Sequence, residues 1–200
     1  MLWTIVPIRG LARSKSRLIG AINDEERLAL NEWMLRTVLE AVSASQSGLD
    51  RCLVVSPSAD AIDFAKSLGA QVLDEPEPMG LNQGLGFAAG HATAHGATRL
   101  LVLPADLPYV TGHAIDQLLE VAKQGQWIVI AADHTSTGTN ALVLDVPTRF
   151  RFRFGEGSLL LHREEAIRIG AAVVVHRDDA IANDLDSPED LARWQARFPP

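Results

Sequence analysis

Short apolar runs alternate with longer amphipathic segments along most of the chain. Runs rich in β-branched and aliphatic residues predict strands at residues 3–8, 52–56, 71–75, 99–105, 127–133, 140–146 and 171–178. Helical periodicity predicts helices at residues 24–45, 60–68, roughly 82–97, 113–124 and 157–169, with a short last helix near the end of the chain. Apolar runs separated by helices indicate strands that are covered on both faces. The pattern therefore predicts a three-layer α/β/α fold with a mostly parallel sheet.

The connection between residues 133 and 154 is different, because two predicted strands follow each other there without a helix. This makes the predicted sheet mixed. Two hundred residues with a 47% apolar share, without an internal repeat or a linker-like stretch, favour a single domain over residues 1–200. In such folds ligands bind beyond the carboxyl ends of the strands, so polar motifs directly after strands are the candidates for a site.

Charge and cysteine content narrow the function classes. Eighteen basic and 25 acidic residues give a net charge of −7, which argues against a nucleic-acid partner. The one cysteine, Cys52, lies in an apolar run and is expected to be buried. The N-terminal "MLWTIVPIRG" reaches proline and arginine too early for a signal peptide or a membrane span, so a cytoplasmic protein is expected.

A cluster of cations follows the first predicted strand: Arg9, Arg13, Lys15 and Arg17. One interpretation is a phosphate-binding loop, in which Gly10 allows close backbone approach and the cations donate charge-assisted hydrogen bonds. The other is a solvated basic loop. The acidity of the whole chain favours the first interpretation, although the spacing of a Walker loop is absent.

Two further strands also end in polar motifs. After residues 71–75, the "GLN" at residues 80–82 predicts a helix cap or, alternatively, a pocket in which Asn82 reads the edge of a purine. After residues 99–105, Asp106 stands between two prolines. It either shapes an Asx-turn or supplies a metal-binding carboxylate at the end of the strand.

The stretch "NDLDSPEDL" places Asp184 and Asp186 on either side of Leu185. Ser187 and Pro188 are suited to start the last helix, but a helix start does not explain two preceding acids. In an extended conformation the two carboxylates share one face and Leu185 turns to the core. Together with Asp106 they would form a cluster that repels itself in the absence of a divalent cation.

Two clusters of glycine and hydroxyl residues remain, "STGTNALVL" at residues 136–144 and "FRFGEGSLLLHREEA" at residues 152–166. Each has an ordinary interpretation, as a hairpin turn and as a helix N-cap. Together they would suit a phosphorylated carboxylic acid, because the start of a helix attracts anions.

The ordered motifs "VPIRGLARSKSRL", "EPEPMGLNQGL", "LPADLP", "GTNALVL", "FRFGEGSLLLHREEA" and "NDLDSPEDL" resemble the phospholactate guanylyltransferase family of deazaflavin coenzyme biosynthesis over nearly the whole chain. The resemblance implies a GT-A-like nucleotidyltransferase fold. It also implies that GTP and a small phosphorylated acid are joined with release of pyrophosphate. The acid is 2-phospho-L-lactate, phosphoenolpyruvate or 3-phospho-D-glycerate, according to the member. Family members often form dimers, which makes a homodimer one of the expected states.

The resemblance also assigns roles to residues that match the family's motifs. It implies Mg²⁺ as the cofactor, a loop that holds the triphosphate, a guanine side and an acceptor side. The residues implied are Asp106, Asp184 and Asp186 for the metal; Pro7, Arg9, Lys15 and Arg17 for the triphosphate, with Asp106; Gly80, Leu81 and Asn82 for guanine; and Thr139, Asn140, Gly155 and Ser158 for the acceptor. The chain departs from the family pattern at Arg9, where many members have lysine, and at His134 and Thr135, where an arginine-bearing turn is expected.

Other functions share parts of this pattern. A nucleotidyltransferase for a sugar phosphate or molybdopterin would keep the fold and the metal, but it would not need the "GTNAL" and "FGEGS" motifs. A nucleotide-binding regulator would keep the pocket without turnover. The favoured hypothesis is in-line attack of an acceptor phosphate oxygen on the α-phosphorus of GTP, with catalysis by positioning and charge neutralisation.

Overall fold

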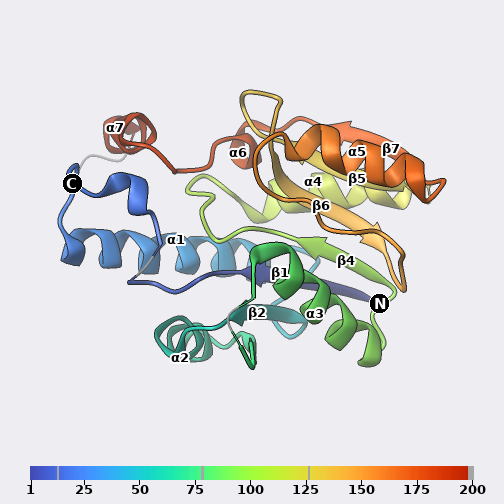
Figure 1. Cartoon of the computed structure of the whole chain (residues 1–200), viewed down its shortest axis with the longest axis horizontal. Helices are drawn as coiled ribbons and strands as arrows, with labels where there is room; N and C mark the ends of the chain where they lie inside the picture. The colour runs from blue at the N-terminus through green and yellow to red at the C-terminus, as the bar shows by residue number, and fades with distance from the viewer. Residues whose placement is uncertain (13, 78, 126, 198–200) are drawn as a thin grey trace.

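The computed structural model describes residues 1–12, 14–77, 79–125 and 127–197. Seven strands form one sheet in the order β3-β2-β1-β4-β6-β5-β7, with helices on both faces (Figure 1). The β6 strand is antiparallel to its neighbours β4 and β5, and the other pairings among the described residues are parallel. The strands are β1 (Leu2–Pro7), β2 (Cys52–Ser56), β3 (Gln71–Asp74), β4 (Arg99–Val102), β5 (Trp127–Ala132), β6 (Thr139–Asp145) and β7 (Ala172–His176).

Two hydrophobic clusters fill the space between the sheet and the helices. One packs α1 (Asp24–Ala44), α2 (Ala59–Ser67) and α4 (Gly112–Lys123) on one face, and the other packs α3 (Leu81–Ala94) and α5 (Ser158–Arg168) on the opposite face. The predicted three-layer α/β/α architecture with a mixed, mostly parallel sheet is therefore confirmed. Within the described ranges, no helix combines the length and the apolar content that crossing a membrane requires.

The predicted elements are all present, with small differences at their ends. The β4 strand ends at Val102 instead of residue 105, because Pro104 has no N–H for the sheet ladder. Two short elements were not predicted, the 3-10 helix η1 (Ser16–Leu18) and α6 (Asp179–Ala182). Elements of three or four residues are too short to show a hydrophobic period.

Side-chain caps fix the starts of two helices that matter for the site. Asn23 and Glu26 form a reciprocal capping box at the start of α1. At the start of α7 (Pro188–Arg197), the Ser187 hydroxyl accepts from the backbone N–H of Asp190 at 3.2 Å, as predicted. Asp190 Oδ2 in turn accepts from the backbone N–H groups of Asp186 and Ser187, at 3.0 and 2.8 Å. The α7 start therefore fixes the backbone that carries Asp186.

A third hydrophobic cluster joins parts of the chain that are distant in sequence. It contains the buried residues Leu18, Leu30, Met34, Leu185 and Leu191. They come from η1, α1, the segment before α7 and α7 itself. Leu185 is fully buried, so its predicted turn toward the core is confirmed. The cluster brings the basic loop and the "DLD" segment to the same end of the sheet.

The α5 helix holds the extended segment of residues 149–154 through two side chains. Glu165 Oε1 accepts from the Arg151 N–H at 2.8 Å, and His162 Nε2 accepts from the Arg153 N–H at 3.0 Å. Because Nε2 is an acceptor, the neutral His162 ring carries its proton on Nδ1 and donates it to Thr139 Oγ1, at 3.0 Å. Burial, followed by the charge of Arg153, lowers the pKa of His162 to about 4.

His162 should make the stability of the fold depend on pH. The ordinary pKa is 6.5 and the folded value about 4, so the unfolded chain takes up the proton first as the pH falls. The stabilisation is complete above pH 6.5 and is lost progressively toward pH 4, by about 3 kcal/mol. Urea unfolding of the wild type and His162→Gln should show a flatter pH dependence for the variant. The exposed His113→Gln is the control, and equal pH dependence of all three proteins would contradict the prediction.

Candidate active site

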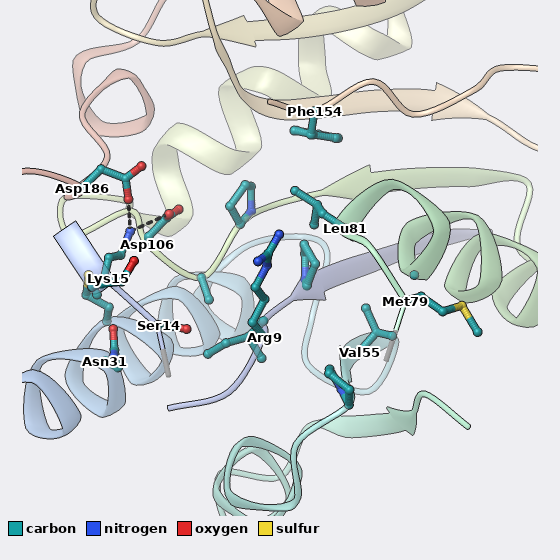
Figure 2. Close-up of a pocket in the computed structure, with 18 of the residues that line it drawn as sticks. Arg9, Ser14, Lys15, Asn31, Val55, Met79, Leu81, Asp106, Phe154 and Asp186 are labelled. Atoms are coloured by element: carbon teal, nitrogen blue, oxygen red, sulfur yellow. Dashed lines mark hydrogen bonds and ion pairs between the residues drawn. The ribbon is translucent and has the colours of Figure 1, made fainter. Parts of the chain in front are cut away.

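A cavity of about 430 Å³ opens at the carboxyl ends of the central strands, where the fold predicts a ligand (Figure 2). Its volume lies in the range of small-molecule sites. Pro7 at the end of β1, Val55 in β2 and Asp106 after β4 all line it, together with side chains from α1, α3 and the basic loop. The cavity therefore collects residues from several of the motifs that follow strands in the sequence.

The basic loop is anchored from α1 and α2. Asp60 Oδ2 accepts from the backbone N–H groups of Leu11 and Ala12, at 3.1 and 3.0 Å, and Asn31 Nδ2 donates to the Leu11 carbonyl at 2.6 Å. Partial burial opposes ionisation of Asp60, but hydrogen bonds from Ser58 and from backbone N–H groups lower its pKa overall. These bonds give the loop a defined shape before any ligand binds.

Lys15 lies at the centre of the site. Its Nζ donates to Asp106 Oδ2 at 2.7 Å and to Asp186 Oδ1 at 2.5 Å, and its side chain is 6% exposed. Burial by itself lowers the pKa of the ammonium group, but the charges of Asp106 and Asp186 outweigh this, and the pKa lies above its ordinary value. Lys15 is therefore charged, and it joins two carboxylates that the sequence placed 80 residues apart.

The third predicted carboxylate, Asp184, lies beside this pair. Asn140 Nδ2 is 3.3 Å from Asp184 Oδ1, and the Leu185 N–H donates to the Asp106 carbonyl at 3.1 Å. Burial, followed by the charges of Asp106 and Asp186, raises the pKa of Asp184. The three carboxylates are thus close enough to interact electrically, as the sequence predicts.

These carboxylates suit a hard cation chemically, because Mg²⁺ takes oxygen ligands and the cluster holds excess negative charge. In the described parts of the chain, however, no group of three or more acidic, histidine or cysteine side chains is already arranged around a metal position. The Lys15 ammonium lies between two of the three carboxylates instead. Mg²⁺ stays a prediction.

The other basic residues of the loop differ in position. Arg9 points into the middle of the cavity, between Lys15 and Leu81 (Figure 2). Arg17 is largely exposed, with Nη1 3.9 Å from Asp186 Oδ2, and it also lines the cavity. Arg13, the fourth cation of the motif, lies outside the described residues. Two arginines and Lys15 therefore surround the space next to the carboxylates.

The residues predicted for the guanine side are only partly in the cavity. Leu81 lines it, and Gly80 is the N-cap of α3. Asn82 faces Phe154 instead: its Oδ1 accepts from the Phe154 N–H at 2.7 Å and its Nδ2 donates to the Phe154 carbonyl at 3.0 Å. Both amide atoms of Asn82 are therefore bonded to the Phe154 backbone in this structure, and a role of Asn82 in reading a base stays a prediction.

The predicted acceptor residues lie together, but they are absent from the described lining of the cavity. Thr139 and Ser158 are buried, and Asn140 Nδ2 donates to the Ile181 carbonyl at 2.9 Å. The first N–H groups of α5 are also bonded within the protein, from Ser158 to the Gly155 carbonyl and from Leu159 to the Thr137 carbonyl. Phe154, which does line the cavity, directly precedes this group.

Several lining residues were missed by the sequence analysis: Asn31, Met34, Glu75, Met79, Gly84 and Phe154. For two of these residues the sequence contains a feature that could have identified them. Glu75 directly follows β3, where the strand-end rule places site residues, and Asn31 is a polar residue on the buried face of α1. The others are apolar or glycine residues whose part in the site depends on the tertiary packing.

Comparison with known proteins agrees with this geometry. A chain described as phosphoenolpyruvate guanylyltransferase, from Rubrobacter xylanophilus, is 42% identical over 97% of this chain and 93% of its own length. One from Phenylobacterium zucineum, described as 3-phospho-D-glycerate guanylyltransferase, is 34% identical over 93% of this chain and 86% of its own length. A nucleotidyl transferase structure from Methanothermobacter thermautotrophicus has a TM-score of 0.67 at 16% identity, covering 99% of this chain and 97% of that one.

The solved structure supports the fold, which is that of the GT-A-like nucleotidyltransferases. The family assignment comes from sequence. The family model described as "Guanylyl transferase CofC like" matches residues 2–194, which is almost the whole chain and includes every motif of the cavity. This protein therefore belongs to the CofC-like guanylyltransferase family.

Proposed function

We propose that this protein transfers GMP from GTP to the phosphate of a small phosphorylated carboxylic acid, with phosphoenolpyruvate as the first candidate, and releases pyrophosphate. The observation that carries the proposal is the cavity in which Lys15 lies between Asp106 and Asp186, with Arg9 and Arg17 nearby. The choice of acid is supported by the name of the 42% identical relative.

The proposed reaction depends more on the positioning of its two substrates than on proton transfer. An oxygen of the acceptor phosphate is already anionic, so it forms a bond to the α-phosphorus of GTP without a general base. The bond from the α-phosphorus to the bridging oxygen breaks, and pyrophosphate leaves. Lys15, Arg9 and Arg17 line the cavity and neutralise the charge that develops on the leaving group. The anchored backbone of the basic loop keeps these cations in place.

Asp106, Asp184 and Asp186 are the residues that would hold Mg²⁺, which supplies charge neutralisation for phosphate oxygens when it is bound. Support for this assignment comes from their proximity: burial, and then the charges of Asp106 and Asp186, raise the pKa of Asp184. Asn140 donates to Asp184 and so connects this group to β6, where Thr139 begins the acceptor side.

The proposal extends to the cellular role. The family resemblance supports a step in coenzyme F420 biosynthesis, in which the guanosine diphospho-acid is passed to a deazaflavin acceptor by another enzyme. Both substrates are free cytoplasmic metabolites in this proposal, and nucleic acid and membrane take no part. A homodimer stays a prediction.

The first test measures pyrophosphate release from GTP and Mg²⁺ with each of phosphoenolpyruvate, 3-phospho-D-glycerate and 2-phospho-L-lactate in turn. Phosphoenolpyruvate should give the highest kcat/KM. A few pocket contacts decide between such similar acids, so differences of about 10- to 100-fold are expected. Absence of release with all three acids, with GTP binding retained, would instead indicate a nucleotide-binding regulator.

Asp186→Asn tests the charged cluster. It removes one anionic partner of Lys15 and one predicted metal ligand, so turnover should fall by about 10³-fold or more. Thermal unfolding should change little, because Lys15 keeps Asp106 as its partner. Asp63→Asn removes an exposed carboxylate on α2 and is the matched control. Wild-type activity in Asp186→Asn would exclude the assigned role.

Thr139→Val tests the acceptor side. Loss of the hydroxyl should raise the KM for the acid by about 10-fold, the effect expected of one lost hydrogen bond to a charged group, while the KM for GTP stays unchanged. Thr139→Ser keeps the hydroxyl and should restore the acid KM. Equal changes in both KM values would show that Thr139 acts only through the fold.

A further inference from the structure

Glu75 is a carboxylate in the cavity that the proposed mechanism does not use. It follows the last residue of β3, lines the cavity and is only partly exposed. Its Oε2 accepts from the Met79 N–H at 2.9 Å, and its own backbone N–H donates to the Ser56 carbonyl at 3.0 Å. The turn from β3 to α3 therefore holds this side chain in a defined orientation.

The other carboxylate oxygen of Glu75 lies against the backbone of α3 at Gly84. A Cβ at Gly84 would be 2.4 Å from Glu75 Oε1, closer than such atoms can approach. Gly84 also lines the cavity. The carboxylate can occupy its position only because residue 84 has no side chain.

The residue that bonds Glu75, Met79, lies away from Lys15 (Figure 2). Met79 is on the opposite side of the cavity from Lys15, Asp106 and Asp186, and Arg9 lies between the two sides (Figure 2). Since the proposed function puts the phosphates at Lys15, the base of the nucleotide must lie toward Met79. The labelled lining there is apolar, with Val55, Met79 and Leu81 (Figure 2), and apolar side chains suit the faces of a purine.

The polar groups at this end match guanine and not adenine. Guanine offers two adjacent donors, N1–H and the N2 amine, and one acceptor, O6; adenine has an acceptor at N1. A carboxylate only accepts, and each of its oxygens has two lone pairs, so Glu75 can accept from both guanine donors in addition to the Met79 N–H, and it faces the lone pair of adenine N1 unfavourably. The α3 helix begins at Leu81 without a side-chain cap from the described residues, and the Gln83 N–H already donates to the Gly80 carbonyl at 2.9 Å, so the N–H groups of its first two residues are the candidates to donate to O6.

We propose that Glu75 determines the specificity for guanine, by accepting hydrogen bonds from N1–H and the N2 amine of GTP, and that Gly84 keeps the space for its carboxylate. This inference rests on the proposed function, because that function places the triphosphate at Lys15. It assigns base recognition to Glu75 in place of Asn82, whose amide is bonded to Phe154.

Glu75→Gln tests this directly. The variant should lose binding to GTP by about 10-fold or more and lose less for ATP, because a glutamine amide can donate to adenine N1. Calorimetric titration with GTP, ITP and ATP gives the affinities without turnover. ITP lacks the N2 amine, so the wild type should prefer GTP to ITP, and the variant should show a smaller preference. Glu77→Gln alters an exposed neighbour outside the cavity lining and should behave as wild type.

A second pair of variants, with substitutions in α3, tests the position of the same carboxylate. Gly84→Ala places a methyl group where Glu75 Oε1 lies, and the flexible carboxylate must move away. It should reduce the GTP-to-ATP preference as Glu75→Gln does. Gly86→Ala, two residues along the same helix, meets open space and is the matched control. Each variant adds one alanine to the same α3 helix, so helix propensity changes alike in both. A difference between the two variants therefore reports on Glu75.

The outcomes separate this inference from the proposed function. An unchanged GTP-to-ATP ratio in Glu75→Gln, or equal losses for all three nucleotides, would overturn the role of Glu75 and leave only a structural bond to Met79. Absence of pyrophosphate release in the wild type, together with GTP-selective binding that depends on Glu75, would overturn the proposed reaction and support base recognition.

Discussion

The ion pair of Lys15 with Asp106 and Asp186 is the contact on which the arrangement of the site depends. Asp106 and Asp186 lie 91 and 171 residues after Lys15 in the chain. The ion pair therefore forms only when the basic loop, the end of β4 and the segment before α7 are all in place. A buried ammonium group is unfavourable unless it is paired, and two carboxylates that close to each other are unfavourable without a cation. Each group therefore removes the cost of burying the other, and the Leu185-to-Asp106 backbone bond fixes their separation.

Apolar packing, more than this ion pair, provides the stability of the region. Buried ion pairs contribute little net free energy, because desolvation offsets the attraction. The cluster of Leu18, Leu30, Met34, Leu185 and Leu191 lies behind the charged groups and removes apolar surface from water. With this division of roles we expect a charged side chain of the site to be replaceable without loss of the fold, because the leucines determine where the segments lie.

The fold and the approximate place of the site were predictable, because apolar periodicity reports the layers and parallel strands bring their carboxyl ends to one edge. Asp106 was predicted by that rule, and Glu75 obeys it as well, whereas Asp184 and Asp186 were predicted from the acidic pair that precedes the last helix. Side-chain direction was predictable for Leu185, from the alternation of an extended segment, but not for side chains that bond across elements. Asn82 turned toward the Phe154 backbone, 72 residues away, and Gly84 matters only because Glu75 lies against it. Such relations depend on contacts between elements, which a single sequence does not record. The roles of the individual site residues stay predictions.

The buried pairing of His162 with Thr139 has a consequence for the kind of atom that Thr139 can meet. Its oxygen already accepts the Nδ1 proton, because the Arg153 N–H occupies the other ring nitrogen. The hydroxyl hydrogen of the buried Thr139 is then the atom with which it can donate to another group. As a donor this hydrogen suits the oxygen of an anion, while His162 already uses one of the two lone pairs with which the oxygen could accept an N–H. His162 thus fixes one hydrogen bond of the residue that the proposed function assigns to the acceptor side.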